Sequence, residues 1–297
     1  MTSGHVLAIL GGSGLYDLDG LSDVRRVEVT TPFGPPSDAV ICGNLGETRL
    51  LFLPRHGRGH RLAPHQIDYR ANICAIKKLG ATHLVSVSAV GSLREDIAPG
   101  DFVVVDQFVD LTRRRVSTFF EDGIVAHVAF ADPVCGHLAE ALFQAAEGSA
   151  KKVHRGGAYV CIDGPQFSTR AESLLYRSWG MSVIGMTAMP EAKLAREAEL
   201  PYAMLALATD YDCWRVSGDE VSVDTVVAVL QQNVKAARQA LSQLVRRLPD
   251  PSISVATGAL AGAIMTDRSK IPPDTRARLD WLIASRLADP DEPRSTP

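Results

Sequence analysis

An apolar run of strand length ends in two acidic residues in the stretch Tyr202-Ala203-Met204-Leu205-Ala206-Leu207-Ala208-Thr209-Asp210-Tyr211-Asp212. Residues two apart in an extended backbone point to the same side, so the carboxyl groups of Asp210 and Asp212 can converge on one small ligand beyond the strand. Proteins that alternate strands and helices usually keep their ligand sites at the carboxyl ends of strands. A bare acid pair at such a position is most often a cap for the next loop. The stretch therefore predicts a strand of an α/β protein that ends in either a loop cap or a ligand site.

The overall composition is ordinary for a soluble globular protein, since 46% of the 297 residues are hydrophobic and 22% are charged. A net charge of -3 argues against a general binder of nucleic acid or of membrane surfaces, because both usually need a basic excess. No apolar run approaches the roughly 20 residues that span a bilayer, and the start of the chain shows no secretory signal. The five scattered cysteines lack a C-x-x-C pair, which predicts reduced thiols, a cytoplasmic location and no structural zinc.

Strands alternate with helices along most of the chain. The alternation predicts an α/β architecture with a largely parallel or mixed sheet, and the crowded early strands predict extra antiparallel pairing. We expect strands at Val6–Leu10, Val27–Thr31, Ala39–Cys42, Leu50–Leu53, Leu84–Ser88, Phe102–Val105, Ala158–Ile162, Ser182–Gly185 and Tyr202–Ala208. We expect helices at Gln66–Leu79, His137–Ala146, Ala171–Trp179 and Pro190–Glu199, and a long one from near Ser222.

The segment Leu248-Pro249-Asp250-Pro251 breaks the long helix and divides the chain. We expect one domain over residues 1–248 and a C-terminal extension over residues 249–297. Within the extension, residues 275–288 are predicted to form one amphipathic helix, and the last nine, rich in Pro, Asp and Glu, to be disordered. A segment this short is better suited to cover the body or a neighbouring subunit than to form a separate catalytic module.

Three loops that follow expected strands carry groups able to bind an anion. Gly11-Gly12-Ser13-Gly14 offers free backbone N–H groups, but it lacks the complete G-x-G-x-x-G pattern of a dinucleotide site. Arg55-His56-Gly57-Arg58 offers guanidinium forks suited to phosphate oxygens and a directed histidine N–H. Val87-Ser88-Ala89 offers a hydroxyl and small-residue amides. Each loop alone is also compatible with a tight turn or, for the second, with solvated cations paired to nearby acids.

Taken in order, the motifs resemble those of the trimeric purine nucleoside phosphorylases, in the 5′-methylthioadenosine phosphorylase branch of that family. The resemblance covers roughly residues 5–247, and its specificity lies in the ordered set rather than in one motif. The set is Gly11-Gly12-Ser13-Gly14-Leu15, Thr31-Pro32-Phe33-Gly34, Arg55-His56-Gly57-Arg58, Asn72-Ile73, Gly91-Ser92-Leu93-Arg94-Glu95, Gly164-Pro165-Gln166-Phe167-Ser168, Met186-Thr187 and Ala208-Thr209-Asp210-Tyr211-Asp212-Cys213-Trp214.

The resemblance implies a nucleoside phosphorylase fold: a mixed, partly barrel-like central sheet flanked by helices, in a homotrimer. It implies inorganic phosphate as co-substrate, no cofactor, and a place in purine and methionine salvage. Its catalytic residues correspond to Asp210, Asp212 and His56. The implied phosphate ligands are Ser13, Arg55, His56, Ser88, Ala89 and Thr187. The implied nucleoside contacts are Phe167 and Ser168 at the base, Met186 at the ribose, Asp210 and Asp212 at the purine edge, and a 5′ pocket of Val223, Val226 and Val227 with His127 of a neighbouring subunit.

The family's reaction explains these residue types. Cleaving the bond between ribose and purine creates positive charge on the sugar and negative charge on the base. Phosphate held beneath C1′ stabilises the positive sugar and then forms a bond to C1′. The purine leaves well when its N7 receives a proton. We expect Asp210 to supply that proton, with a pKa raised by burial and by nearby Asp212, while ionised Asp212 holds the 6-amino group.

Substrate choice is read from the same groups. Relatives that handle 6-oxopurines carry Glu at the Ser168 position and Asn at the Asp210 position, so this pair favours adenine. The valine cluster favours an apolar 5′ substituent such as methylthio, although 5′-deoxyadenosine fits as well. The expected reaction is reversible phosphorolysis of 5′-methylthioadenosine to adenine and 5-methylthioribose 1-phosphate.

Four other functions stay open at this point. They are a broader purine nucleoside phosphorylase, an adenine nucleosidase that uses water, a dinucleotide-dependent oxidoreductase and a non-catalytic nucleoside-binding protein. Compared with other members of the family, the tail beyond Pro249 is longer than expected.

Overall fold

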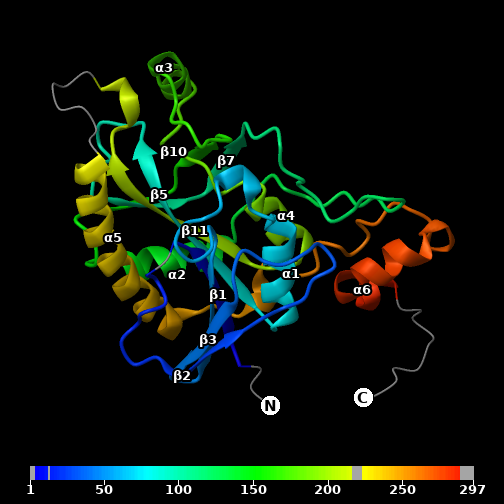
Figure 1. Ribbon diagram of the computed structural model, residues 1–297. Helices are drawn as coiled ribbons and strands as arrows, with labels where there is room; N and C mark the ends of the chain where they lie inside the picture. The colour runs from blue at the N-terminus through cyan, green and yellow to red at the C-terminus, as the bar shows by residue number, and fades with distance from the viewer. Residues whose placement is uncertain (1–3, 13, 216–222, 288–297) are drawn as a thin grey trace.

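An eleven-stranded mixed sheet forms the centre of the molecule (Figure 1). The structure, a computed structural model, describes residues 4–12, 14–215 and 223–287, the last range without the side chains of residues 223–228. The strands are β1 (Val6–Gly11), β2 (Ser22–Val27), β3 (Val40–Leu45), β4 (Thr48–Pro54), β5 (His83–Ser92), β6 (Phe102–Val105), β7 (Gln107–Asp110), β8 (Val153–Arg155), β9 (Ala158–Cys161), β10 (Val183–Gly185) and β11 (Tyr202–Asp210).

Helices cover both faces of this sheet. α2 and α5 pack on one face, and α1 and α4 on the other (Figure 1). The helices are α1 (Tyr69–Lys78), α2 (Gly136–Ala146), α3 (Arg170–Ser178), α4 (Glu191–Glu197), α5 (Val223–Leu244) and α6 (Pro273–Leu287). The α/β class with a mixed sheet flanked by helices is therefore confirmed.

Strand alternation explains how one sheet supports two apolar layers. Along β1, Leu7 and Ile9 point into the layer with α2 and α5, whereas Ala8 and Leu10 point into the layer with α1 and α4. Successive side chains of a strand face opposite sides, so a sheet covered on both faces reads as a continuous apolar run. This is why β1 and β11 stand out in the sequence.

The order of the sheet brings four parallel strands together. β4, β1, β5 and β11 are neighbours in that order, and each adjacent pair is parallel. The end of β5 also pairs in antiparallel fashion with β10 at Val183–Ser92 and Ile184–Gly91. β5 is thus shared by two branches of the sheet, and the segments that follow β1, β4, β5 and β11 all leave from one edge.

Two groups of strands differ from the sequence prediction. The expected strand at Val27–Thr31 is wrong. The strand in this region is β2, the earlier and mostly exposed segment Ser22–Val27, which pairs with β3. β7 and β8 were not expected, since each is only three or four residues long and partly exposed. The predicted antiparallel pairing of the early strands is confirmed by the β2–β3 and β3–β4 pairs.

The C-terminal extension packs against the main body through α6. The Trp281 ring meets the edges of Phe119 and Phe33, with ring centroids 5.2 Å and 6.4 Å apart. Leu279 and Leu282 join the same apolar cluster as α1 and α4. α6 is the predicted amphipathic helix, and the last nine residues, predicted to be disordered, lie outside the described residues.

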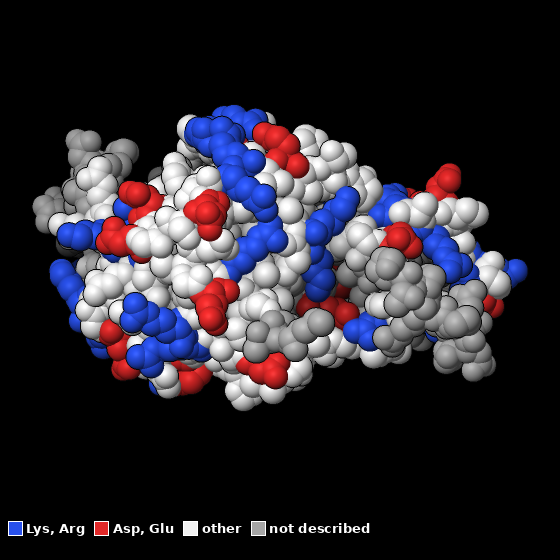
Figure 2. Space-filling view, turned by 90° about the horizontal axis from the view of Figure 1, so that it is seen from below, with Lys and Arg blue, Asp and Glu red and all other residues white. Residues whose placement is uncertain are grey.

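Charged side chains are scattered over the surface. Figure 2 shows basic and acidic side chains interspersed on one face, with uncharged areas between them. Within the part of the chain that the structure describes, no helix is long and apolar enough to cross a membrane.

Candidate active site

The predicted acid pair lies at the carboxyl end of β11, against Gly91 of β5. A Cβ atom placed on Gly91 would lie 3.2 Å from both the Asp210 Oδ1 atom and the Asp212 Cβ atom, so glycine lets both acids lie close to β5. The backbone N–H of Asp212 donates to Asp210 Oδ1 at 2.7 Å, and the Thr209 hydroxyl donates to Asp210 Oδ2 at 2.7 Å. The two acids therefore form one connected unit.

The reason for this convergence differs from the one expected. Strand pairing is already irregular between Ala208 and Asp210, and β11 ends at Asp210. Asp212 has a left-handed backbone (φ 52°) and opens a short 3-10 turn. Asp212 is thus brought beside Asp210 by a turn and not by strand alternation.

Burial raises the pKa of Asp210, although the Thr209 hydroxyl and the Asp212 backbone N–H act in the opposite direction. Burial also raises the pKa of Asp212, where the Ser173 hydroxyl lowers it and the charge of Asp210 raises it further. The expectation that nearby Asp212 raises the pKa of Asp210 is wrong: burial raises it, and Asp212 acts on it through its backbone N–H, which lowers it. Both carboxyl groups consequently hold a proton more readily than exposed acids do.

The segment predicted to meet the base lies beside this acid pair. The Ser173 hydroxyl of α3 donates to Asp212 Oδ2, and the Cys213 thiol donates to the Ser168 carbonyl at 3.2 Å. The Ser168 Oγ atom is buried and has no hydrogen-bond partner among the described residues. Phe167 is 83% exposed and presents an aromatic face at this edge.

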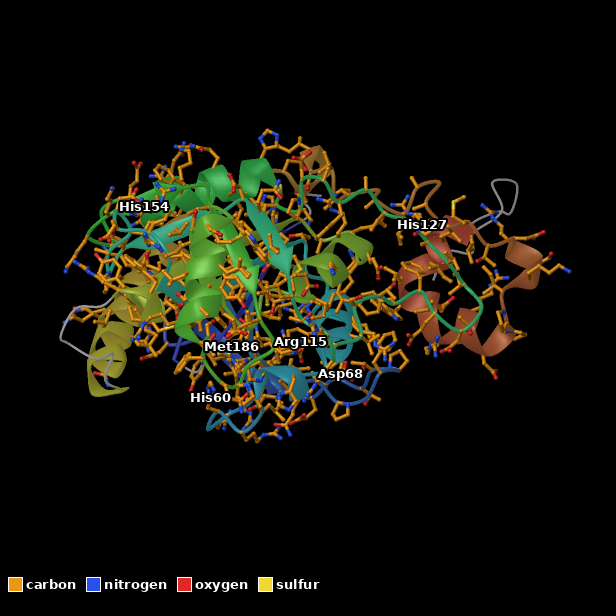
Figure 3. All side chains as sticks on the ribbon, turned by 90° about the horizontal axis from the view of Figure 1, so that it is seen from above. His60, Asp68, Arg115, His127, His154 and Met186 are labelled. Carbon is orange, nitrogen blue, oxygen red and sulfur yellow. The ribbon has the colours of Figure 1, made fainter. Side chains whose placement is uncertain are left out.

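Met186 follows β10 and packs against a glycine. A Cβ atom on Gly164 would lie 2.3 Å from the Met186 sulfur, and Gly164 has a positive φ of 62°. Gly164 therefore sets where the methionine side chain lies. Figure 3 shows Met186 and His60 on the same part of the body.

Two predicted phosphate ligands meet directly. The Ser88 and Thr187 hydroxyl oxygens are 3.2 Å apart, and either can donate to the other. Ala89, the next predicted ligand, is exposed beside Ser88. Ser88 and Gly91 are three residues apart on β5, which is about 10 Å at the usual rise of a strand. The hydroxyl pair and the acid pair thus gather at two positions of the same strand.

Arg55 lies beneath this edge as a buried cation, 1% exposed. Its guanidinium donates to both carboxylate oxygens of Glu191, at 2.7 Å and 3.2 Å. Burial lowers the pKa of Arg55, but the ion pair with Glu191 outweighs burial and raises the pKa above its ordinary value. The Tyr202 hydroxyl also donates to Glu191, at 3.2 Å. Arg55 is therefore a permanent cation whose charge is largely offset within the protein.

The His56 ring presents a lone pair to a ligand. Its Nδ1 atom is 2.9 Å from the Leu62 carbonyl oxygen, which can only accept, so Nδ1 carries the proton of the neutral ring. Burial lowers the pKa of His56 to about 4, against the opposing hydrogen bond to Leu62. The remaining Nε2 atom is an acceptor at neutral pH, whereas the sequence interpretation had given His56 a donor role. The ring also stacks on His60, with centroids 4.1 Å apart.

Several predicted residues are not brought to this edge or lie outside the description. Ser13 is not described, and Val223, Val226 and Val227 belong to α5 without described side chains. His127 is exposed, its backbone N–H donates to the Ala263 carbonyl, and Figure 3 shows it far from Met186, beside the C-terminal extension. Within one chain, His127 is separate from the site.

Sequence reasoning missed Glu191, Thr209 and Ser173, which hold the predicted residues in place. Glu191 follows a Pro in the first turn of a helix, where an acid is usually a partner for the helix dipole. Its actual partner lies 136 residues away in sequence, and no local pattern indicates such a pair. Thr209, in contrast, directly precedes the acid pair and could have been included on position alone.

A separate cavity of about 240 Å³ lies beside the N-terminus of α1. None of the predicted site residues lines it. Its lining residues are His65, Gln66, Ile67, Asp68, Tyr69, Arg70, Arg114, Arg115 and Val116. The chemical groups argue for the edge formed by β5, β10 and β11, since the acids and the paired hydroxyls gather there.

The chain matches known proteins along most of its length. A sequence profile described as the phosphorylase superfamily matches residues 6–246. A relative from Geobacter sulfurreducens named S-methyl-5′-thioadenosine phosphorylase is 56% identical over 282 residues, which cover 95% of this chain and 99% of the relative. A relative of the same name from Thermosynechococcus vestitus is 54% identical over 285 residues, with 95% and 99% covered. These alignments run beyond residue 246, so the expectation that the extension is unusually long is wrong.

Solved structures give the same result. A methylthioadenosine phosphorylase from an antarctic soil metagenomic library superposes with a TM-score of 0.89 at 48% identity, covering 94% of this chain and 99% of the other. A methylthioadenosine phosphorylase from Schistosoma mansoni in complex with adenine superposes with a TM-score of 0.82 at 37% identity, covering 88% and 99%. The chain therefore belongs to the S-methyl-5′-thioadenosine phosphorylase family, within the phosphorylase superfamily.

Proposed function

We propose that this enzyme cleaves 5′-methylthioadenosine with inorganic phosphate and releases adenine and 5-methylthioribose 1-phosphate, in a reversible reaction. The substrate is the one named for its relatives. The observation that carries the proposal is that β5 links the two ends of the site: Ser88 of the hydroxyl pair and Gly91, which lies against the half-buried Asp210 and Asp212, are about 10 Å apart along the strand. One nucleoside with phosphate beneath its sugar fills that interval.

The acid pair supports departure of the base. Burial keeps a proton on Asp210 more readily than in water, so its carboxyl group can donate to N7 as the glycosidic bond breaks. Asp212 accepts from the 6-amino group while Ser173 holds its orientation. A carboxylate facing the carbonyl of a 6-oxopurine would repel it, so the pair selects adenine.

The phosphate end combines neutral donors with one acceptor. Ser88 and Thr187 donate to phosphate oxygens, and Arg55 supplies positive charge from below. His56 Nε2 accepts a hydrogen bond from the remaining P–O–H group of hydrogen phosphate, because Nδ1 is committed to Leu62. The phosphate oxygen that faces C1′ then attacks as the bond to the base lengthens.

The finer assignments rest on the resemblance and on burial. Phe167, Ser168 and Met186 contact the base and ribose, Ser13 and Ala89 complete the phosphate site, and Val223, Val226 and Val227 form the 5′ pocket. His127 reaches the site of another copy in a homotrimer, which fits its exposure and its distance from the site of its own chain. The reaction needs no cofactor, 5′-deoxyadenosine is a second substrate, and the five free thiols fit the cytoplasm.

The test is the dependence of adenine release on phosphate. Purified protein is given 5′-methylthioadenosine, 5′-deoxyadenosine, adenosine or inosine, with and without phosphate, and base release is followed by absorbance. We expect methylthioadenosine and 5′-deoxyadenosine to be cleaved only with phosphate, and inosine to be a poor substrate. Equal cleavage without phosphate would establish a nucleosidase instead, and efficient cleavage of inosine would establish a broader purine nucleoside phosphorylase.

A further inference from the structure

The buried Arg55–Glu191 pair joins segments that are far apart in the sequence. Besides its ion pair, the Arg55 guanidinium donates to the Ser86 hydroxyl at 2.7 Å and to the Leu10 carbonyl at 3.1 Å, with Val87 oxygen at 3.5 Å. The Arg55 backbone N–H donates to the Gly11 carbonyl at 2.9 Å. One side chain thus contacts the end of β1 and the part of β5 that leads into the phosphate hydroxyls.

Glu191 links the same cluster to the segment that follows β10. It is the first residue of α4 and follows Thr187, the partner of Ser88, by four residues. Its carboxylate holds Arg55 through both oxygens, and Tyr202 of β11 donates to it. Through Arg55, which follows β4, the ends of β1 and β4 and the middle of β5 are therefore tied to the Glu191 carboxylate, which also binds the start of β11.

We propose that Glu191 is a positioning residue for phosphate: it fixes Arg55 and, through Arg55, the spacing of the hydroxyls that receive the anion. The proposal rests on the proposed phosphorolysis. Glu191 is fully buried, so it acts through Arg55 and not by contact with substrate.

Stability alone does not explain a pair of this kind. Replacing a buried ion pair by apolar residues of similar volume is often neutral or stabilising, so a fold has no general need for one. Removing only one partner leaves a buried charge uncompensated, and the unpaired side chain then moves or draws in water. Loss of the Glu191 charge should accordingly displace Arg55 and the segments that it contacts, while the acid pair beside Gly91 stays in place.

The first variant is Glu191→Gln, which keeps the shape and removes the charge. We expect the phosphate KM to rise at least tenfold and the nucleoside KM to change less than threefold. Glu197→Gln is the matched control, because Glu197 is a buried carboxylate at the other end of α4 that bonds to Thr118 and Phe119 instead. The control should keep the phosphate KM of the wild type. Equal rises in both KM values of Glu191→Gln, or the same rise in the control, would overturn the proposal.

A double-mutant cycle tests whether Glu191 acts through Arg55. In an Arg55→Ala background, Glu191→Gln should raise the phosphate KM no further, because the group that it positions is absent. The same fold-change in both backgrounds refutes the coupling. If Glu191→Gln is poorly folded, Glu191→Asp replaces it in both backgrounds: it keeps the charge but shortens its reach, and we expect a smaller rise confined to phosphate.

Wild-type measurements separate this inference from the proposed function. If the wild type releases adenine equally fast without phosphate, phosphorolysis itself fails and the positioning role fails with it. If the wild type requires phosphate and its melting temperature rises with phosphate alone, phosphorolysis stands. In that case an unchanged phosphate KM in Glu191→Gln refutes only the role of Glu191.

Discussion

Asp210→Asn is the substitution that most directly probes the chemistry. It removes the only proton that the carboxyl group can give to the purine and changes almost nothing in shape. The asparagine oxygen can still accept from the Asp212 N–H, which lies 2.7 Å from Asp210 Oδ1. The asparagine NH₂ would face the Thr209 oxygen. The Thr209 hydroxyl can then donate to the Val90 carbonyl, 3.2 Å away, and its oxygen can accept a hydrogen bond from the NH₂ group.

The effects on folding and on catalysis should therefore differ in size. One rearranged hydrogen bond is worth about 1 kcal/mol of folding free energy. The native pKa of Asp210 is raised, so its contribution to stability is present at low pH and lost as the pH rises through that pKa. The asparagine variant avoids this loss and should be no less stable above neutral pH. Loss of a general acid lowers kcat by about 10² to 10⁴, or roughly 3 to 5 kcal/mol of transition-state stabilisation.

The assay is kcat for methylthioadenosine with saturating phosphate, measured from pH 5 to 9 beside thermal melts. In the wild type, kcat should fall as the pH rises through the pKa of Asp210, and the variant should lack that limb. A variant kcat within tenfold of the wild type would refute the proton-donor role. So would a loss of activity that follows a loss of folded protein in the melts.

Three further substitutions test other parts of the structure. Gly164→Ala should raise the nucleoside KM at least tenfold, because the new Cβ atom would displace the Met186 sulfur. Gly180→Ala is the control, because Gly180 also has a left-handed backbone but has open space where the Cβ atom would lie. Equal effects of the two substitutions on the nucleoside KM would contradict this account. Burial raises the pKa of Glu197 to about 7 from 4.5. The free energy of unfolding should therefore fall by at most about 3 kcal/mol as the pH rises from 4.5 to 7. In urea unfolding, Glu197→Gln should flatten this dependence of stability on pH. An unchanged slope would show that Glu197 titrates normally. Trp281→Ala should lower the melting temperature by several degrees, since truncating a packed aromatic costs about 3 kcal/mol, and an unchanged melt would mean that α6 adds nothing to the body.

The sequence could predict the strands that the core buries and the loops that follow them. β1 and β11 read as apolar runs because both faces of the sheet are covered, and their ends carry glycines or acids. β2 is an exposed edge strand made of polar residues, so hydrophobic pattern cannot find it. Its position is set by pairing with β3, which depends on the tertiary structure and not on the local sequence.

The candidate site shows the same division. Asp210 could be singled out because it ends a strand, and Ser88 because the apolar run of β5 ends there, although the strand itself continues to Ser92. The Arg55–Glu191 pair could not, since ion pairing across 136 residues depends on how α4 packs. The acceptor role of His56 likewise depends on where the Leu62 carbonyl lies, and residue type alone leaves both ring nitrogens equivalent candidates.

Strand β5 carries both ends of the proposed site, with Ser88 near the anion and Gly91 against the two acids. A strand has a nearly fixed rise per residue, so the spacing between its phosphate end and its base end is fixed by the backbone. Side-chain replacements can alter which base is accepted at one end, or how the anion is held at the other, without changing that length. Descendants of such a protein can therefore acquire a new nucleobase preference while they inherit the same reaction geometry.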